Sequence, residues 1–317
     1  LNGFSTSLPE EVQIEALNKI EGFEKARMMR PGYAIEYDYV PPHQIKRTME
    51  TKIISGLFFA GQINGTTGYE EAACQGLMAG INASLTVQDK DPFVLLRSQG
   101  YIGVLIDDLI SKGTEEPYRM FTSRAEHRIL LRQDNADQRL TKIGHSLGLV
   151  TEGRYTRFQQ KMEKCLALEQ WVESTSIKPE QINPLLESMG KSPIKQSVKA
   201  TAIIGRPEIS LEMLIDAAND RERLDAIGAT QPEIMHTIET QFKYAGYIEK
   251  EFEMVEELKK QEELIIPESI HYNKIKSLSS EGKSKLEHVR PETLGQASRI
   301  SGVSQSDLAV LLVYLKG

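Results

Sequence analysis

The segment from residue 56 to residue 73 contains the residue types that could hold a cofactor. It begins with an apolar run, continues through a turn in which polar residues separate Gly61, Gly65 and Gly68, and ends in a helix-like run. A strand that passes through such a turn into a helix directs backbone N–H groups and the positive end of the helix dipole towards one point. The segment therefore predicts a nucleotide-cofactor site in an α/β domain.

The candidate cofactor-binding residues lie in this turn and at the start of the following helix. They are Gly61, Gln62, Asn64, Gly65, Thr66, Thr67, Gly68 and Tyr69. Gln62 can both donate and accept a hydrogen bond, which would suit a ribityl hydroxyl or a pyrophosphate. By pattern alone, a structural turn is an equally good interpretation, because the sequence has no G-x-G-x-x-G fingerprint.

A run rich in arginine extends from residue 116 to residue 139. Arg124, Arg128 and Arg132 recur every four residues, which on a helix predicts one face of guanidinium groups. Such a face could bind RNA phosphates. The alternative is an internal network of ion pairs with the acidic neighbours Glu126, Asp134 and Asp137.

A second basic stretch extends from residue 271 to residue 290. The candidate RNA-binding residues are Lys274, Lys276, Lys283, Lys285 and Arg290. A local cluster of cations beside Tyr272 fits contact with a phosphate backbone, although the whole chain carries a net charge of −7. A solvated helical face is an equally good interpretation of the same residues.

The type of predicted secondary structure changes near residue 90. Strands are expected over residues 33–40 and 53–60, followed by a helix over 69–85. Beyond residue 90, helical periodicity dominates. The expected helical regions are 93–112 (two short helices broken at Gly100), 123–148 (with an interruption near Asp134 and Asn135), 151–175, 178–190, 210–218 and 231–261. The last residues, 293–315, resemble a helix-turn-helix with Ser304 as an N-cap, but the second helix is so apolar that we expect a small bundle instead.

Composition sets further limits on the class of protein. The 317 residues suffice for two or three domains, and no apolar run approaches the roughly 20 residues of a bilayer span. We therefore expect no association with a membrane. Cys74 and Cys165 are far apart and indicate a reducing, cytoplasmic environment without a disulfide framework. The spacing of His and Cys predicts no metal site.

Four motifs, in order, resemble the MnmG (GidA) family of tRNA uridine-5-carboxymethylaminomethyl modification enzymes. They are RPGYAIEYDY at 30–39, AGQINGTTGYEEAA at 60–73, the arginine-rich run at 118–139 and RPETLGQASR at 290–299. The resemblance implies an FAD-dependent enzyme that uses NADH and methylenetetrahydrofolate as the carbon donor. It also implies a homodimer that acts with the GTPase MnmE on C5 of the wobble uridine of certain tRNAs.

The same resemblance implies roles for particular residues. Gln62 matches a contact to FAD, and the turn from Gly61 to Tyr69 would lie against the cofactor. Relatives often carry Ala where this chain has Cys74, so we do not expect Cys74 to be catalytic. The catalytic residues, the glycine-rich FAD fingerprint and the nicotinamide-binding segment are expected upstream of Leu1.

We therefore expect an α/β region, the C-terminal part of a Rossmann-like FAD-binding domain, over residues 1–89. An all-α, multi-helix region is expected to follow, with a helical domain over 90–209 and a C-terminal helical subdomain that binds tRNA and partner over 210–317. The alternative is another flavoprotein oxidoreductase that acts on a small molecule and dimerises through a helical tail. A nucleic-acid-binding module without enzymatic activity is a third interpretation.

Overall fold

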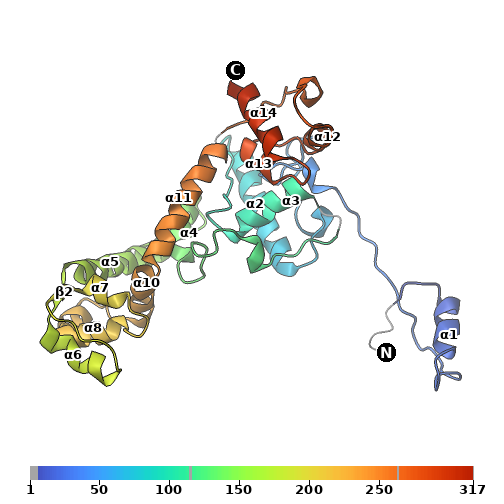
Figure 1. The fold of residues 1–317 in the computed structure, drawn as a ribbon. Helices are drawn as coiled ribbons and strands as arrows, with labels where there is room; N and C mark the ends of the chain where they lie inside the picture. The colour runs from blue at the N-terminus through green and yellow to red at the C-terminus, as the bar shows by residue number, and fades with distance from the viewer. Residues whose placement is uncertain (1–5, 114–115, 263, 317) are drawn as a thin grey trace.

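A computed structural model describes residues 6–113, 116–262 and 264–316, and the regular secondary structure of these residues is almost entirely helical. A central body carries an arm that ends in α1 (Glu10–Asn18), as Figure 1 shows. The long helix α11 (Ala245–Glu262) connects a distal helical domain to the neighbourhood of a C-terminal bundle (Figure 1). The prediction of a multi-helix region after residue 90 is confirmed.

The central body is built on two helices, α2 (Tyr69–Val87) and α3 (Tyr101–Lys112). Short 3-10 turns precede and follow them: η1 (Pro42–Gln44), η2 (Gly61–Asn64) and η3 (Thr122–Arg124). Met78 of α2 and Ile106 of α3 are buried in one apolar cluster with Ile45 and Met49. The helix predicted over residues 69–85 is therefore confirmed. Of the two short helices predicted over 93–112, the one after Gly100 is confirmed as α3, and the one before Gly100 is not formed.

The strands predicted in the first 60 residues are not formed. Residues 33–39 are exposed and have no regular structure, and residues 53–60 make bends near an isolated bridge between Glu50 and Phe58. A strand needs a continuous ladder of hydrogen bonds to a neighbour, whereas among the described residues these segments make only isolated ones, such as that from the Phe59 N–H to the Met49 carbonyl at 3.0 Å. The two-residue strands β1 (Ser176–Ile177) and β2 (Val198–Lys199) form the one antiparallel sheet of the described chain. The Rossmann-like sheet is thus absent from the described residues.

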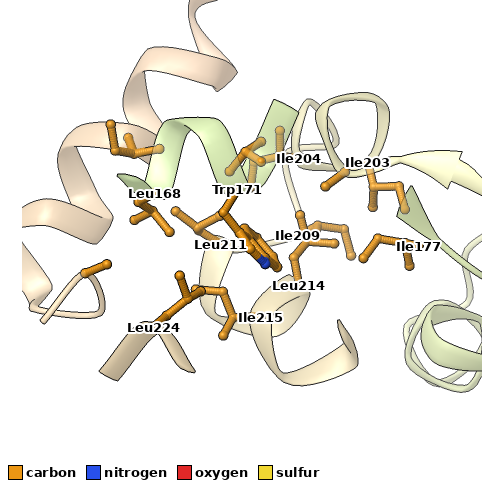
Figure 2. Packing of buried hydrophobic residues seen from close by; sticks show 14 of the residues in the cluster. Leu168, Trp171, Ile177, Ile203, Ile204, Ile209, Leu211, Leu214, Ile215 and Leu224 are labelled. Carbon is orange, nitrogen blue, oxygen red and sulfur yellow. The ribbon is translucent and has the colours of Figure 1, made fainter. Parts of the chain in front are cut away.

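The distal domain encloses the largest apolar cluster (Figure 2). Its helices are α5 (Glu152–Ser174), α6 (Pro179–Ser188), α7 (Ala200–Ile204), α8 (Leu211–Ala218), α9 (Arg221–Ala226) and α10 (Pro232–Lys243). Trp171 lies in this cluster, and its indole N–H donates to Asp220 Oδ2 at 2.7 Å. Proline begins α6 and α10, where its missing N–H costs no hydrogen bond, and the Ser210 hydroxyl accepts from the Met213 N–H at the start of α8.

The helix predicted over residues 231–261 is interrupted at Tyr244. The interruption separates α10, which packs against α5, from α11, which contacts α13 (Leu294–Arg299) in the C-terminal bundle. Figure 1 shows α10 within the distal helical domain and α11 extending from it towards the C-terminal bundle.

The C-terminal bundle has its own buried core around Tyr272 and Leu286. Its remaining elements are η4 (Tyr272–Lys274), α12 (Ser280–Val289) and α14 (Gln305–Lys316). The Ser304 hydroxyl accepts from the Asp307 N–H at 3.2 Å, so the predicted N-cap is confirmed. Leu308 and Leu311 of α14 are buried in the bundle, which accounts for the apolar character of this helix. None of the helices in the described part of the chain has the length and apolar character to cross a membrane.

Candidate functional site

The glycine-rich turn has the backbone conformation that its glycines predict. Gly61 has φ of 84° and Gly65 has φ of 78°, a left-handed region that favours glycine. Gly68 leaves room for a neighbouring side chain, because a Cβ there would lie 1.7 Å from Glu71 Oε2 and would displace that carboxylate. Each of the three glycines therefore has a physical role in shaping the turn before α2.

One buried glutamine of α2 holds the turn in place. Gln75 Oε1 accepts from the Gly61 N–H at 3.0 Å and from Asn64 Nδ2 at 2.8 Å. Gln75 Nε2 donates to Thr66 Oγ1 at 2.9 Å. The Gln75 and Asn64 side chains are fully buried. Sequence reasoning missed Gln75, although a glutamine on the same helix face as Met78 and Asn82 is a recognisable signal of a buried polar contact.

The turn offers fewer available amides than the sequence predicts. The Gly61 N–H is bound to Gln75, and the Gly65 N–H donates to the Gln62 carbonyl at 2.9 Å. The Glu71 carboxylate lies over the start of α2 and accepts from the Met120 N–H at 2.9 Å. A carboxylate in this position disfavours a second anion at the helix N-terminus.

The hydrogen bonds and charges of the glycine-rich turn indicate which part of a flavin cofactor could fit against it. Asn64 Oδ1 is buried, and no hydrogen-bond donor among the described residues reaches it. A ligand group that donates a hydrogen bond would satisfy it. Together with Glu71, this orphaned acceptor makes the turn better suited to a neutral, hydrogen-bonding part of FAD than to its pyrophosphate.

The predicted cofactor-binding residues divide by exposure. Gln62 and Gly65 are half-buried, whereas Thr67 and Tyr69 are exposed. The remaining four are buried: Gly61, Asn64, Thr66 and Gly68. Side-chain contact with a ligand is therefore open to Gln62, Thr67 and Tyr69. Among the four buried residues, Asn64 has the unpartnered side-chain atom Oδ1, whereas Gly61, Thr66 and Gly68 shape the backbone.

A cavity of about 510 Å³ opens beside the first turn of α2. Cys74 lines it together with Glu70, Tyr101 and Arg119. Burial, and after it the charges of Glu71 and Glu70, raise the pKa of the Cys74 thiol. Cys74 is thus kept protonated, which makes it a poor nucleophile.

Tyr118 connects the turn to a buried cluster of charges. Its N–H donates to the Gly65 carbonyl at 2.8 Å, and its hydroxyl donates to Asp108 Oδ2 at 2.9 Å. Asp108 Oδ1 in turn accepts from Arg97 Nη1 at 2.7 Å. Burial and the neighbouring Asp108 carboxylate raise the pKa of the Tyr118 hydroxyl, so it remains a donor. The sequence gives no sign of this contact, because Arg97 and Tyr118 lie on separate irregular segments.

The arginine row predicted on one helix face is not formed. The 3-10 turn η3 and the later helix α4 (Ala136–Ser146) are the helical elements of this region. The predicted helical region over 123–148 is therefore confirmed after the interruption near Asp134 and is wrong before it. Arg124 lies over the Tyr118 ring at 4.5 Å, whereas Arg132 Nε is 3.1 Å from Asp134 Oδ1. Arg128 is exposed.

The alternation of buried and exposed side chains over residues 125–127 explains why the predicted helix is not formed here. Ala125 and His127 are buried, while Glu126 between them points to Arg97 and forms an ion pair at 2.7 Å. His127 Nδ1 lies 2.9 Å from Glu251 Oε2 of α11. Of the acidic partners expected for the row, only Asp134 pairs with one of its arginines, since Asp137 pairs with Lys161 at 2.6 Å.

The basic stretch of the C-terminal bundle retains much of its charge at the surface. Lys274, Lys276 and Lys285 are exposed, and Lys283 is half-buried. Within the described residues, no ion pair neutralises these four lysines. Arg290 differs, because it donates to the Ile270 carbonyl at 2.8 Å, pairs with Glu287 and lies over the Tyr272 ring. Its role is therefore to hold the bundle together.

Models of known protein families match successive parts of this chain. The family described as "Glucose inhibited division protein A" matches residues 1–91. The "tRNA modifying enzyme MnmG/GidA C-terminal helical domain" matches residues 152–252, and the "tRNA modifying enzyme MnmG/GidA C-terminal helical bundle" matches residues 254–317. This chain belongs to the MnmG/GidA family.

Individual members of the MnmG/GidA family are similar over nearly all of the chain. The tRNA uridine 5-carboxymethylaminomethyl modification enzymes MnmG of Christiangramia forsetii and Flavobacterium psychrophilum are each 55% identical over 315 residues, which is 99% of this chain. Those residues make up 50% of each relative, so the chain spans about half the length of the curated relatives it matches. The structure of Aquifex aeolicus GidA in its form II crystal superposes with a TM-score of 0.75 at 42% identity, covering 99% of this chain and 49% of that one.

Proposed function

We propose that the protein containing this chain is an FAD-dependent enzyme that adds a carboxymethylaminomethyl or aminomethyl group to C5 of the wobble uridine in tRNA. The observation that carries the proposal is the 55% identity over 315 residues with enzymes whose names state a uridine 5-carboxymethylaminomethyl modification. The uncompensated lysines of the C-terminal bundle support an RNA substrate, since phosphate contacts dominate RNA affinity.

The contribution of this chain to the chemistry is positioning. Gln62 and Thr67 would donate to or accept from FAD, while Gln75 fixes the turn that presents them. Bound FAD supplies the oxidation and reduction that the residues of this chain lack. Glu71 and Tyr118 hold the loop 118–122 beside the first turn of α2, where the cavity of about 510 Å³ could exclude water from the reacting groups.

The remaining parts of the proposal rest on the family resemblance. NADH would serve as reductant and methylenetetrahydrofolate as carbon donor. A homodimer in the cytoplasm would act together with the GTPase MnmE. The helical domains over residues 90–209 and 210–317 would contact tRNA and this partner, while residues 1–89 would complete the FAD-binding domain.

Purification of the full-length protein tests the proposal directly. We expect a yellow protein with a flavin absorption spectrum. Incubation with unmodified tRNA, the GTPase, GTP, NADH, methylenetetrahydrofolate and glycine or ammonium should change the mass of the wobble nucleoside. A colourless protein, or a flavoprotein that leaves the wobble uridine unmodified under these conditions, would contradict it.

A further inference from the structure

A second cavity of about 510 Å³ lies where residues 96–99, residues 130–139 and helices α10 and α11 meet. It shares no lining residue with the turn before α2. Its lining combines arginine and lysine side chains, carboxamides and one exposed aromatic ring. The residues that carry the argument are Arg132, Gln138, Arg139, Phe252, Glu256 and Lys259.

Arg139 brings a positive charge that its neighbours do not neutralise. Its guanidinium donates to Asn135 Oδ1 at 2.9 Å, to the Arg132 carbonyl at 3.0 Å and to the Gln99 carbonyl. These acceptors are uncharged, and within the described residues no ion pair joins Arg139 to a carboxylate. Burial and the adjacent Arg132 guanidinium lower the pKa of Arg139, so an anion in the cavity would be stabilised.

The other basic groups of the cavity differ from Arg139. Arg132 Nε contacts both oxygens of Asp134, at 3.1 and 3.2 Å, and Lys259 lies 3.9 Å from Glu256. These pairs compensate most of the charge of Arg132 and part of that of Lys259. Three of the five N–H groups that a guanidinium carries are occupied in Arg139, which leaves two for a ligand.

Gln138 supplies a carboxamide that can recognise a base. Among the described residues, no hydrogen bond occupies its side-chain amide, whereas the nearby Gln99 and Asn135 side chains are engaged. A carboxamide presents one acceptor and two donors, which matches the edge of a nucleobase.

Phe252 supplies an apolar surface for stacking. It is 56% exposed, and it lines both this cavity and the adjoining groove along α10 and α11. A large aromatic ring beside an arginine and a free carboxamide is the combination that binds unpaired nucleotides, because every base has a face that stacks.

We propose that this cavity binds one unpaired nucleotide, with its phosphate at Arg139, its base on Phe252 and the base edge at Gln138. The proposal rests on the proposed function insofar as the nucleotide belongs to the tRNA substrate. A free nucleotide presents the same chemistry, and the two sources are separated by experiment.

The test uses the full-length protein with three variants. Phe252→Ala and Gln138→Ala remove the stacking surface and the carboxamide. Tyr247→Ala is the matched control, because Tyr247 lies on the same helix, is 63% exposed and does not line the cavity. Filter binding measures Kd for a tRNA transcript, and isothermal titration calorimetry measures Kd for uridine monophosphate.

We expect Phe252→Ala to weaken tRNA binding by about tenfold, the size of one lost base-stacking contact. Gln138→Ala should weaken it by a smaller factor, and Tyr247→Ala should leave it within about twofold of the unchanged protein. If only uridine monophosphate binding falls in Phe252→Ala, the cavity serves a free nucleotide. Unchanged binding of both ligands in Phe252→Ala and Gln138→Ala overturns the proposal.

The same measurements distinguish failure of the proposed function from failure of the cavity proposal. If the unchanged protein binds no tRNA but binds uridine monophosphate through Phe252, the cavity is upheld and the tRNA-modifying function is rejected. If it binds neither ligand, both are rejected. If the unchanged protein binds tRNA, and the binding of both tRNA and uridine monophosphate is insensitive to Phe252→Ala and Gln138→Ala, only the cavity is rejected.

Discussion

Arg299 of α13 donates through Nη2 to Asp107 Oδ1 of α3 at 2.8 Å, although 192 residues separate them in the sequence. Asp107 is 2% exposed, and its other oxygen, Oδ2, also accepts from Arg97 Nη1 at 3.1 Å. Arg97 also forms an ion pair with Glu126 at 2.7 Å. This chain of charges ties the C-terminal bundle to α3 of the central body.

Replacement of Arg299 should loosen the C-terminal bundle from the central body. Arg299→Met leaves the buried Asp107 carboxylate with one fewer partner, and we expect the free energy of unfolding to fall by about 3 kcal/mol. Urea unfolding followed by circular dichroism measures the change. Lys276→Met, which removes an exposed cation of the same bundle, should cost less than about 0.5 kcal/mol. Equal losses in the two variants would contradict the role of the buried pair.

Replacement of Gln62 should weaken flavin retention in the full-length protein. Gln62→Ala removes a half-buried carboxamide that makes no side-chain hydrogen bond to the described residues. The loss of one hydrogen bond, about 1 kcal/mol, predicts roughly fivefold weaker FAD binding. The ratio of flavin absorbance to protein after gel filtration measures it. Gln305→Ala, at an exposed site in the C-terminal bundle, is the control, and an unchanged flavin ratio in Gln62→Ala would count against the site.

Charge reversal in the basic stretch should change both the strength of tRNA binding and its dependence on salt. Lys274→Glu, Lys276→Glu and Lys283→Glu together should weaken tRNA binding at 100 mM salt by at least about tenfold. They should also reduce the slope of log K against log salt by about 2. Electrophoretic mobility shifts at several salt concentrations measure both quantities.

The control for this variant reverses three exposed lysines outside the basic stretch. These are Lys19, Lys25 and Lys90. The control should keep the salt slope of the unchanged protein, because none of its sites belongs to the proposed RNA-facing surface. The same salt slope in the basic-stretch variant and the unchanged protein would reject this surface.

Acid should remove a specific contribution to the stability of the C-terminal bundle. Burial opposes ionisation of Asp307, but hydrogen bonds from the Ser304 hydroxyl and from the Ser279 and Ser304 amides outweigh it and lower the pKa of Asp307 to about 2. A depressed carboxyl pKa stabilises the folded state above its ordinary value of 3.8, and this contribution is lost as the pH falls through the folded-state value.

Asp307→Asn tests this contribution. At pH 7 we expect the free energy of unfolding to fall by about 2 kcal/mol, as for a hydrogen-bonded charge. The difference between the variant and the unchanged protein should shrink steadily between about pH 4 and pH 2. A difference that stays constant over this range would show that the ionised carboxylate is not responsible.

Local sequence was sufficient for many helices and their ends. The helices predicted over 151–175, 178–190 and 210–218 are found as α5, α6 and α8, because their apolar spacing and their caps act within a few residues. The glycines at 61 and 65 likewise predicted a turn, because the left-handed backbone conformation that they adopt depends on the residue itself and not on distant contacts.

The helix predicted over the arginine row and the two predicted strands are not formed for a common physical reason: contacts beyond the local sequence decide the backbone path. The helix predicted through Arg124, Arg128 and Arg132 satisfied local spacing, but burial of Ala125 and His127 and the pairing of Glu126 with Arg97 impose another backbone path. Residues 33–40 and 53–60 make only isolated backbone hydrogen bonds in the described chain, so neither segment has the continuous ladder that a strand requires.

The amino-acid sequence by itself determined the helical character of most of the chain, the glycine-rich turn and the family to which the chain belongs. Only the tertiary structure decided which polar groups meet: Gln75 with Asn64, Tyr118 with Gly65, and Arg299 with Asp107. Helix periodicity depends on neighbours three or four residues away, whereas these contacts depend on how distant segments pack and bury charge together.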